Sequence, residues 1–246
     1  MSEEQKQDGL QACQLGNVVE VAFSFDTTGS MSPCIADVRK QLKELIVQMS
    51  ADIPGLRIAI MAHGDYCDGP NCLYTLDFTE DHDAIIKFVE EVPNTMGGDV
   101  DECYELILHK ARELSWTGKG AFVLIGDAAP HAPDYPDNTD HLDWLEELQE
   151  LCGITKVYAM QCMRGRIGSN NKFWDKVAET AGTKLLQLND FEESAATLGA
   201  VAYAASGDKG LMESYRGCVT RCCAMSADMV ENFDAIERSM DDDEEE

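Results

Sequence analysis

The apolar positions of the chain form two alternating kinds of segment. The first kind is a short, nearly continuous apolar run, which is typical of a buried parallel strand. Such runs predict strands at 18–25, 56–62, 121–125, 156–161 and 184–188. The second kind repeats apolar residues at helical spacing. These repeats predict helices within 35–49, 81–92, 104–114, 142–148, 173–181 and 191–205.

Strands that alternate with helices predict an α/β fold. The expected architecture is a doubly wound, mostly parallel six-stranded sheet with helices on both faces, in a Rossmann-like arrangement. The sixth strand, at 73–78, alternates apolar and polar residues and follows "HGDYCDGPN", which contains residues typical of hairpin turns. We therefore expect this strand to lie antiparallel at one edge of the sheet.

The two ends of the chain differ from the part between them. Residues 1–16 are polar and acidic, and they are expected to form a flexible N-terminal arm. Residues 17–206 carry all the predicted strands and helices, so they form one domain. Residues 207–246 end in "DDDEEE", a run of like charges that repel one another. This tail is expected to be acidic and disordered.

The charge of the chain narrows the range of partners. The sequence has 46 Asp and Glu against 19 Lys and Arg, giving a formal net charge of -27. This charge disfavours nucleic acid and anionic membranes and favours cations or basic partners. The polar, acidic first residues are not expected to act as a secretory signal, and no apolar run is long enough to span a membrane. The 10 cysteines are therefore expected to be reduced thiols of an intracellular, cytoplasmic protein.

Acidic residues end two of the predicted strands. Asp26 follows the first strand and Asp127 the fourth, and these strands are neighbours in the usual doubly wound order. Two adjacent carboxylates repel each other unless a cation lies between them. Thr28 and Ser30 follow at a spacing of two, and oxygen donors of these kinds suit Mg²⁺, with Mn²⁺ as the alternative. The other interpretation is that Asp26 caps a helix and the hydroxyls bind turn amides.

Three motifs give the sequence a family resemblance. "DTTGSM" resembles the D-x-S-x-S motif of von Willebrand factor type A (vWA) domains, which form a metal-ion-dependent adhesion site (MIDAS). "GGDVDE" and "FVLIGDAAPH" stand where that family has its other metal-contacting loops. The resemblance covers about residues 17–206 and implies a protein partner that offers a carboxylate to the metal. It implies five metal ligands: Asp26, Thr28, Ser30, Asp99 and Asp127.

The sequence departs from the family pattern at two of these positions. Thr28 replaces a serine and keeps the hydroxyl, whereas Asp99 stands where threonine is usual. A "GGD" loop is similar to that of an intracellular branch found with alpha-type protein kinases, although no kinase domain follows in this chain. Three aspartates around a divalent ion are expected to bind it tightly and to weaken its attraction for a partner's carboxylate. The metal is then partly structural, or it recruits a less acidic ligand.

The resemblance implies a non-enzymatic, metal-dependent protein-interaction module. The alternative is a Mg²⁺-dependent phosphatase similar to haloacid dehalogenases, with Asp26 as the nucleophile and Lys119 as the only suitable lysine. The chain lacks the small flap that those enzymes insert before the next helix. A third interpretation is that the protein acts through another surface, such as the tail after Gly207.

Overall fold

The computed structural model describes residues 18–31, 45–98, 100–118, 120–162, 171–188 and 194–242. The predicted arm at 1–16, most of the first predicted helix and the last four residues lie outside these ranges. Two residues named above, Asp99 and Lys119, also lie outside them.

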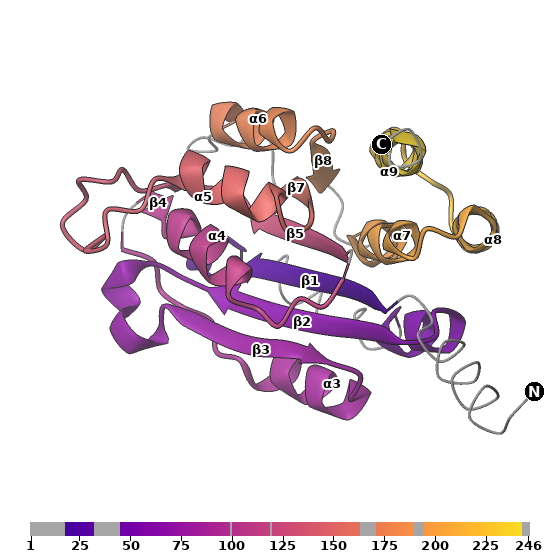
Figure 1. Ribbon diagram of the computed structural model, residues 1–246, viewed down its shortest axis with the longest axis horizontal. Helices are drawn as coiled ribbons and strands as arrows, with labels where there is room; N and C mark the ends of the chain where they lie inside the picture. Colours follow the sequence, from indigo (N-terminus) through magenta and orange to yellow (C-terminus); the bar gives the residue numbers. More distant parts are fainter. Residues whose placement is uncertain are drawn as a thin grey trace, which may run out of the picture.

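A six-stranded sheet forms the centre of the molecule, in the order β3-β2-β1-β5-β7-β8 (Figure 1). Its strands are β1 (Val19–Asp26), β2 (Leu56–His63), β3 (Leu73–Thr79), β5 (Gly120–Gly126), β7 (Lys156–Cys162) and β8 (Leu186–Leu188). Only β2 and β3 pair antiparallel, and the other neighbours pair parallel. The predicted α/β fold, with a mostly parallel six-stranded sheet and one antiparallel edge strand, is therefore confirmed.

Side chains that alternate along β1 enter two separate buried clusters. Phe23 and its neighbours two residues away pack with Val201 of α7. Ala22 belongs to the other cluster, with Leu108 of α4 and Trp174 of α6. The helices of the domain are α3 (His82–Glu91), α4 (Tyr104–Arg112), α5 (Trp144–Cys152), α6 (Asn171–Thr180) and α7 (Ser194–Ala205), and residues 45–52 are also helical.

The expected disorder of the tail is wrong for residues 209–242. This segment forms two helices, α8 (Lys209–Cys222) and α9 (Ala227–Asp242). The physical reason is an apolar stripe on each helix that joins the same buried cluster as α7. Met212 and Tyr215 supply it from α8, and Phe233 and Ile236 from α9. Burial of these side chains outweighs the repulsion between the acidic ones.

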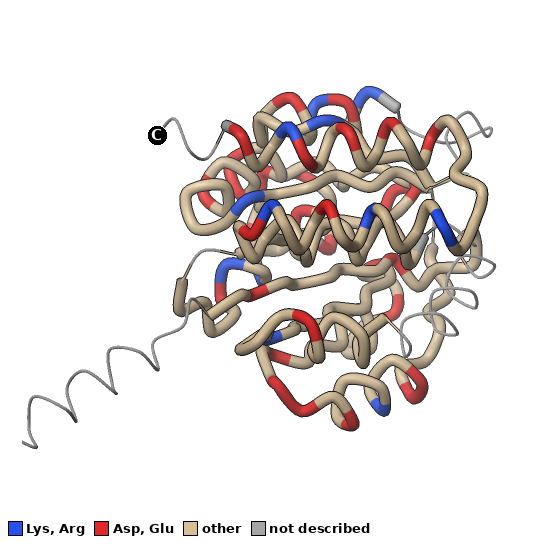
Figure 2. Tube along the Cα trace, turned by 90° about the vertical axis from the view of Figure 1, so that its right-hand side faces the viewer, with Lys and Arg blue, Asp and Glu red and all other residues tan. Residues whose placement is uncertain are grey.

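Ion pairs hold the two tail helices against each other. Lys209 Nζ lies 2.8 Å from Asp241 Oδ1, and the Arg216 guanidinium contacts both Asp234, at 2.7 Å, and Glu237, at 2.5 Å. Figure 2 shows basic positions along α8 beside the acidic positions of α9. Part of the acidic excess of the tail is therefore neutralised within the tail itself.

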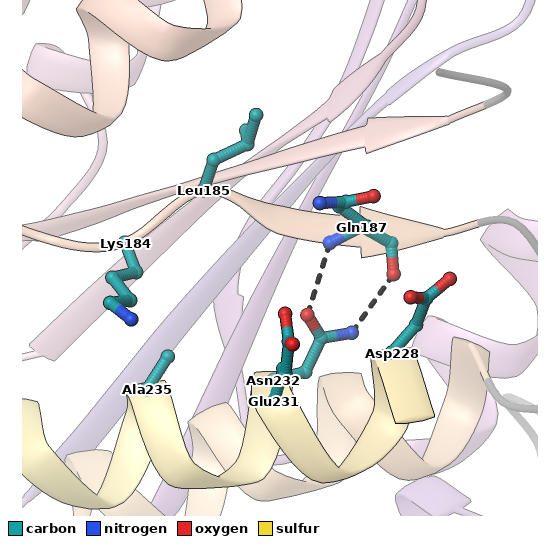
Figure 3. A pocket seen from close by; sticks show the side chains of 7 residues that line it. All are labelled: Lys184, Leu185, Gln187, Asp228, Glu231, Asn232 and Ala235. Atoms are coloured by element: carbon teal, nitrogen blue, oxygen red, sulfur yellow. Dashed lines mark hydrogen bonds between the residues drawn. The ribbon is translucent and has the colours of Figure 1, made fainter. Parts of the chain in front are cut away.

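Helix α9 also closes one edge of the sheet. The Gln187 backbone N–H on β8 donates to Asn232 Oδ1 at 3.1 Å, and Asn232 Nδ2 donates to the Gln187 carbonyl at 2.9 Å. Figure 3 shows this pair in the shallow pocket between β8 and α9. One side chain thus satisfies a donor and an acceptor that an edge strand leaves open.

Two further observations concern membrane-spanning helices and the cysteines. No helix within the described ranges is both long enough and apolar enough to cross a membrane. The cysteines within those ranges are all free, as expected from the sequence.

Candidate functional site

The candidate residues gather at the carboxyl ends of three parallel strands. Asp26 is the last residue of β1 and pairs in register with His63, the last residue of β2. β5 runs parallel on the other side of β1 and leads into Asp127. Because the three strands end at one edge of the sheet, the loops that follow them meet there.

Hydrogen bonds join four of the five predicted site residues. Thr28 donates to Asp26 Oδ1 through its backbone N–H, at 2.9 Å, and through its hydroxyl, at 2.6 Å. The Thr28 and Ser30 hydroxyl oxygens lie 3.4 Å apart, and Ser30 Oγ donates to Asp127 Oδ1 at 3.1 Å. The structure therefore brings these four predicted residues together, while Asp99 lies outside the described ranges.

Tyr104 hydrogen-bonds Asp26, and the sequence did not predict it as a site residue. The sequence predicted it only as an apolar position of a helix. Its hydroxyl donates to Asp26 Oδ2 at 2.7 Å, and the side chain is fully buried. Gly126 makes room for this contact, because a Cβ at that position would lie 1.9 Å from the Tyr104 hydroxyl oxygen. No spacing in the sequence indicates such a contact across 78 residues.

Hydrogen bonds tie the loop before β4 (Asp101–Glu102) to the loop after β1. The Thr95 backbone N–H donates to the Thr27 carbonyl at 3.0 Å, and the hydroxyl oxygens of the same two residues are 3.0 Å apart. Asp68, from the 3₁₀ segment η2 (Tyr66–Asn71), accepts the Met96 N–H at 3.0 Å. These bonds fix the start of the glycine-rich loop beside the site.

Two apolar side chains stand out on this loop. Met96 is 83% exposed and Val100 is 67% exposed, the highest values among the large apolar side chains within the described ranges. The Met96 carbonyl oxygen lies 3.9 Å from the position of a Cβ on Gly29, in the 3₁₀ segment η1 (Gly29–Met31) that carries Ser30. Exposed apolar side chains therefore border the candidate site.

The surroundings of Asp26 are strongly acidic. Burial raises the pKa of Asp26, and hydrogen bonds from Thr28 and Tyr104 oppose that rise. Burial, followed by the negative charges of Asp26 and Asp65, raises the pKa of Glu102 to about 9. Glu102 lies on the two-residue strand β4 (Asp101–Glu102), which pairs with β6 (Ala129–Pro130). The sequence did not predict this small parallel pair.

A second polar cluster lies next to the site. His131 Nε2 and Asp65 Oδ1 are 2.6 Å apart, and the His131 ring stacks on Tyr135 with centroids 3.8 Å apart. His131 is thus a hydrogen-bonded residue of the loop after β5. The ring nitrogens of the buried His63 have no hydrogen-bond partner among the described residues. Burial lowers the pKa of His63 to about 3.

Glu105 in this cluster gives a pH-dependent prediction. Burial raises the pKa of Glu105 from 4.5 to about 7, despite hydrogen bonds from Tyr66 and the His131 backbone. Between these values the folded state holds a proton that the unfolded state releases, so stability falls as pH rises. We expect the stability of Glu105→Gln relative to wild type to rise by about 3 kcal/mol between pH 4.5 and pH 7. Urea unfolding of both proteins across this range measures it, and parallel curves contradict it.

The donor set fits a hard divalent cation. Within the described ranges, no three His, Cys, Asp or Glu side chains are grouped so that they could hold a metal ion. The candidate set instead combines two carboxylates, Asp26 and Asp127, with the hydroxyls of Thr28 and Ser30. Oxygen donors of both kinds suit Mg²⁺ and Mn²⁺. A buried carboxylate oxygen without a partner, Glu102 Oε2, adds to this fit.

Asp26, the nucleophile of the phosphatase alternative, is fully buried. Its two carboxylate oxygens each accept a hydrogen bond, one from Thr28 and one from Tyr104. The lysine of that alternative, Lys119, lies outside the described ranges.

Comparisons with known proteins bear on the fold. No protein-family model matches the sequence, and no curated protein matches it. The fold is similar to that of the pilus adhesin SpaC from Lactobacillus rhamnosus GG, with a TM-score of 0.56 at 12% identity, covering 80% of this chain and 30% of that chain. A von Willebrand factor type A structure from Catenulispora acidiphila gives 0.54 at 15% identity, covering 77% and 42%.

The match to a third structure covers nearly the whole of that structure's chain. The vWF domain of the type V pili tip protein Mfa5 from Porphyromonas gingivalis gives a TM-score of 0.53 at 13% identity, covering 75% of this chain and 93% of that chain. The chain thus spans less than half the length of the first two proteins. Together these similarities show that the chain has a vWA-like α/β fold.

Proposed function

We propose that the chain is a metal-dependent protein-interaction module whose site is a MIDAS. The observation that carries the proposal is the convergence of four side chains: Thr28 donates to Asp26, Ser30 donates to Asp127, and the two hydroxyl oxygens lie 3.4 Å apart. Ser30 and Asp127 come from two loops and lie 97 positions apart in the sequence. The side-chain atoms that meet between these loops are oxygen atoms, which can coordinate a metal ion. Asp99 is the fifth proposed ligand. The proposed ion is Mg²⁺, with Mn²⁺ as the alternative.

The chain's own residues have distinct proposed roles. Asp26 and Asp127 supply charge, Thr28 and Ser30 supply neutral oxygens, and Tyr104 fixes the Asp26 carboxylate. A bound cation supplies a coordination position that an oxygen atom of a partner protein occupies. The proposed partner is a protein, and the exposed Met96 and Val100 side chains provide apolar contact beside that position.

The similar structures and the packing of the buried core give additional support to this proposal. Two of the similar structures are described as a pilus adhesin and a pilus tip protein, which favours recognition over catalysis. The doubly wound arrangement, with helices on both faces, is part of the proposal and is supported by the two buried clusters. Membership of the kinase-associated intracellular branch rests on the "GGD" loop alone.

Calorimetric titration with Mg²⁺ tests the proposal. We expect wild type to bind one ion and Asp127→Asn to lose affinity by about tenfold or more. Asp134→Asn is the matched control, because it removes the same charge from an exposed position in the same loop. Its affinity is expected to stay near that of wild type. Absence of binding by wild type, or equal losses in both variants, overturns the proposal.

A further inference from the structure

Glu102 is held against the candidate site by backbone pairing. In the parallel pair of β4 and β6, Glu102 stands opposite Pro130, three residues after Asp127. This pairing brings the glycine-rich loop and the loop after β5 together. Glu102 thus reaches the site from a third segment of the chain, independent of the segments that carry Ser30 and Asp127.

The Glu102 side chain points into the site. It is only 4% exposed. A Cβ on Gly97 would lie 3.0 Å from Glu102 Oε1 and 3.4 Å from Thr28 Cγ2, so the carboxylate and Thr28 share one small space. The absence of a side chain at Gly97 leaves room for this approach.

The second oxygen of this carboxylate has no partner. Glu102 Oε2 is buried and accepts no hydrogen bond within the described part of the chain. The acidic groups of Asp26, Asp65 and Asp127 all act on this carboxyl group and raise its pKa. A buried carboxylate among like charges costs free energy unless a positive charge joins it. Asp26 and Asp127 are proposed ligands, so the missing positive charge falls at the same place.

We propose that Glu102 becomes a further oxygen ligand of the cation once the bound ion draws its side chain toward Asp26 and Asp127, an inference that rests on the proposed function. Glu102 joins Asp26, Asp99 and Asp127, so the four acidic ligands bring four negative charges to a doubly charged ion. The ion then attracts a further carboxylate weakly. The partner's ligand is therefore a neutral oxygen, such as a backbone carbonyl, a side-chain amide or a hydroxyl.

Titration of the full chain with Mn²⁺, by calorimetry and by electron paramagnetic resonance of the free ion, tests this ligand. We expect Glu102→Gln to lower affinity on the order of tenfold. Glu105→Gln is the matched control: it removes the same charge from another buried glutamate three residues away, which is paired with Tyr66 and His131 instead. A small change in Glu105→Gln separates coordination from general charge loss.

A metal-free measurement adds a second readout. Without metal, Glu102→Gln replaces a buried carboxyl group whose Oε2 has no partner within the described residues, so it is expected to unfold at a urea concentration equal to or above that of wild type. If Glu102→Gln fails to fold, Glu102→Asp takes its place: it keeps the charge but shortens the reach, and it is expected to bind more weakly. Wild-type affinity in whichever variant folds overturns the inference.

The failure of this inference differs from the failure of the proposed function. If neither wild type nor Asp26→Asn binds Mn²⁺, the proposed function fails. If wild type binds, Asp26→Asn does not, and Glu102→Gln binds like wild type, only the role of Glu102 fails.

Acetate, added at saturating Mn²⁺, is the probe for the chemistry of the partner's ligand. Acetate is expected to bind more tightly to Glu102→Gln than to wild type by water-proton relaxation, and equal or weaker binding overturns the neutral-oxygen assignment.

Discussion

Replacing Phe233 with alanine is expected to lower the free energy of unfolding by about 3–5 kcal/mol. Phe233 lies on α9 and is 0% exposed, with its ring 6.1 Å from that of Tyr215 and beneath the Arg216 guanidinium. Its removal leaves a cavity between the tail and the sheet. Urea unfolding followed by circular dichroism measures the change.

The control for this prediction is Val230→Ala on the same helix. Val230 is 36% exposed, so its truncation is expected to cost about 0.5 kcal/mol or less. The pair of variants distinguishes a packed tail from the disordered one that its acidic composition predicts. Equal unfolding midpoints for wild type and Phe233→Ala would mean that the tail adds nothing to the folded domain.

Replacing Gly126 with alanine is the second change with a large expected effect. The added methyl group would lie 1.9 Å from the Tyr104 hydroxyl oxygen, and that side chain cannot retreat because it packs on Phe173 and Trp174. Overpacking and the loss of the hydrogen bond to Asp26 together are expected to cost about 3 kcal/mol. Thermal and urea unfolding measure this loss, and Mg²⁺ affinity is expected to fall with it.

Gly118→Ala is the control at the opposite end of β5, where the nearest atom to a new Cβ is 3.9 Å away. Its stability is expected to match that of wild type within about 0.5 kcal/mol. Tyr104→Phe removes the clashing oxygen, so Gly126→Ala is expected to cost less in that background than in wild type. Additive effects of the two substitutions would show that Gly126 acts on some contact other than the one with Tyr104.

The sequence predicted the sheet because each strand carries its own local signal. The continuous apolar run before Asp26 and the alternation before Thr79 distinguish a central strand from an edge strand without any knowledge of partners. One helix boundary was less well predicted: Leu142 fits the apolar repeat but precedes α5, which begins after the capping residue Asp143. A capping aspartate decides the start of a helix more strongly than one apolar position does.

The residues of the candidate site also fall into two groups, those with a local signal in the sequence and those without one. Asp26, Thr28 and Ser30 form a local motif, and Asp127 follows its own strand, so their position at one sheet edge could be predicted. Tyr104 could not, because it reaches the site through a contact distant in sequence, whereas Glu102 belongs to the "GGDVDE" stretch that the resemblance places at the site. The tail was mispredicted because its net charge concealed the apolar stripe that includes Phe233.

The Asn232–Gln187 contact has a consequence for how copies of this protein behave toward one another. An open strand edge offers a template on which an extended chain from another molecule can add, and such addition is the first step of fibrillar self-assembly. At β8 a helix-borne amide already holds the hydrogen-bonding groups of Gln187. The tail therefore serves as a guard against intermolecular strand addition at that end of the sheet.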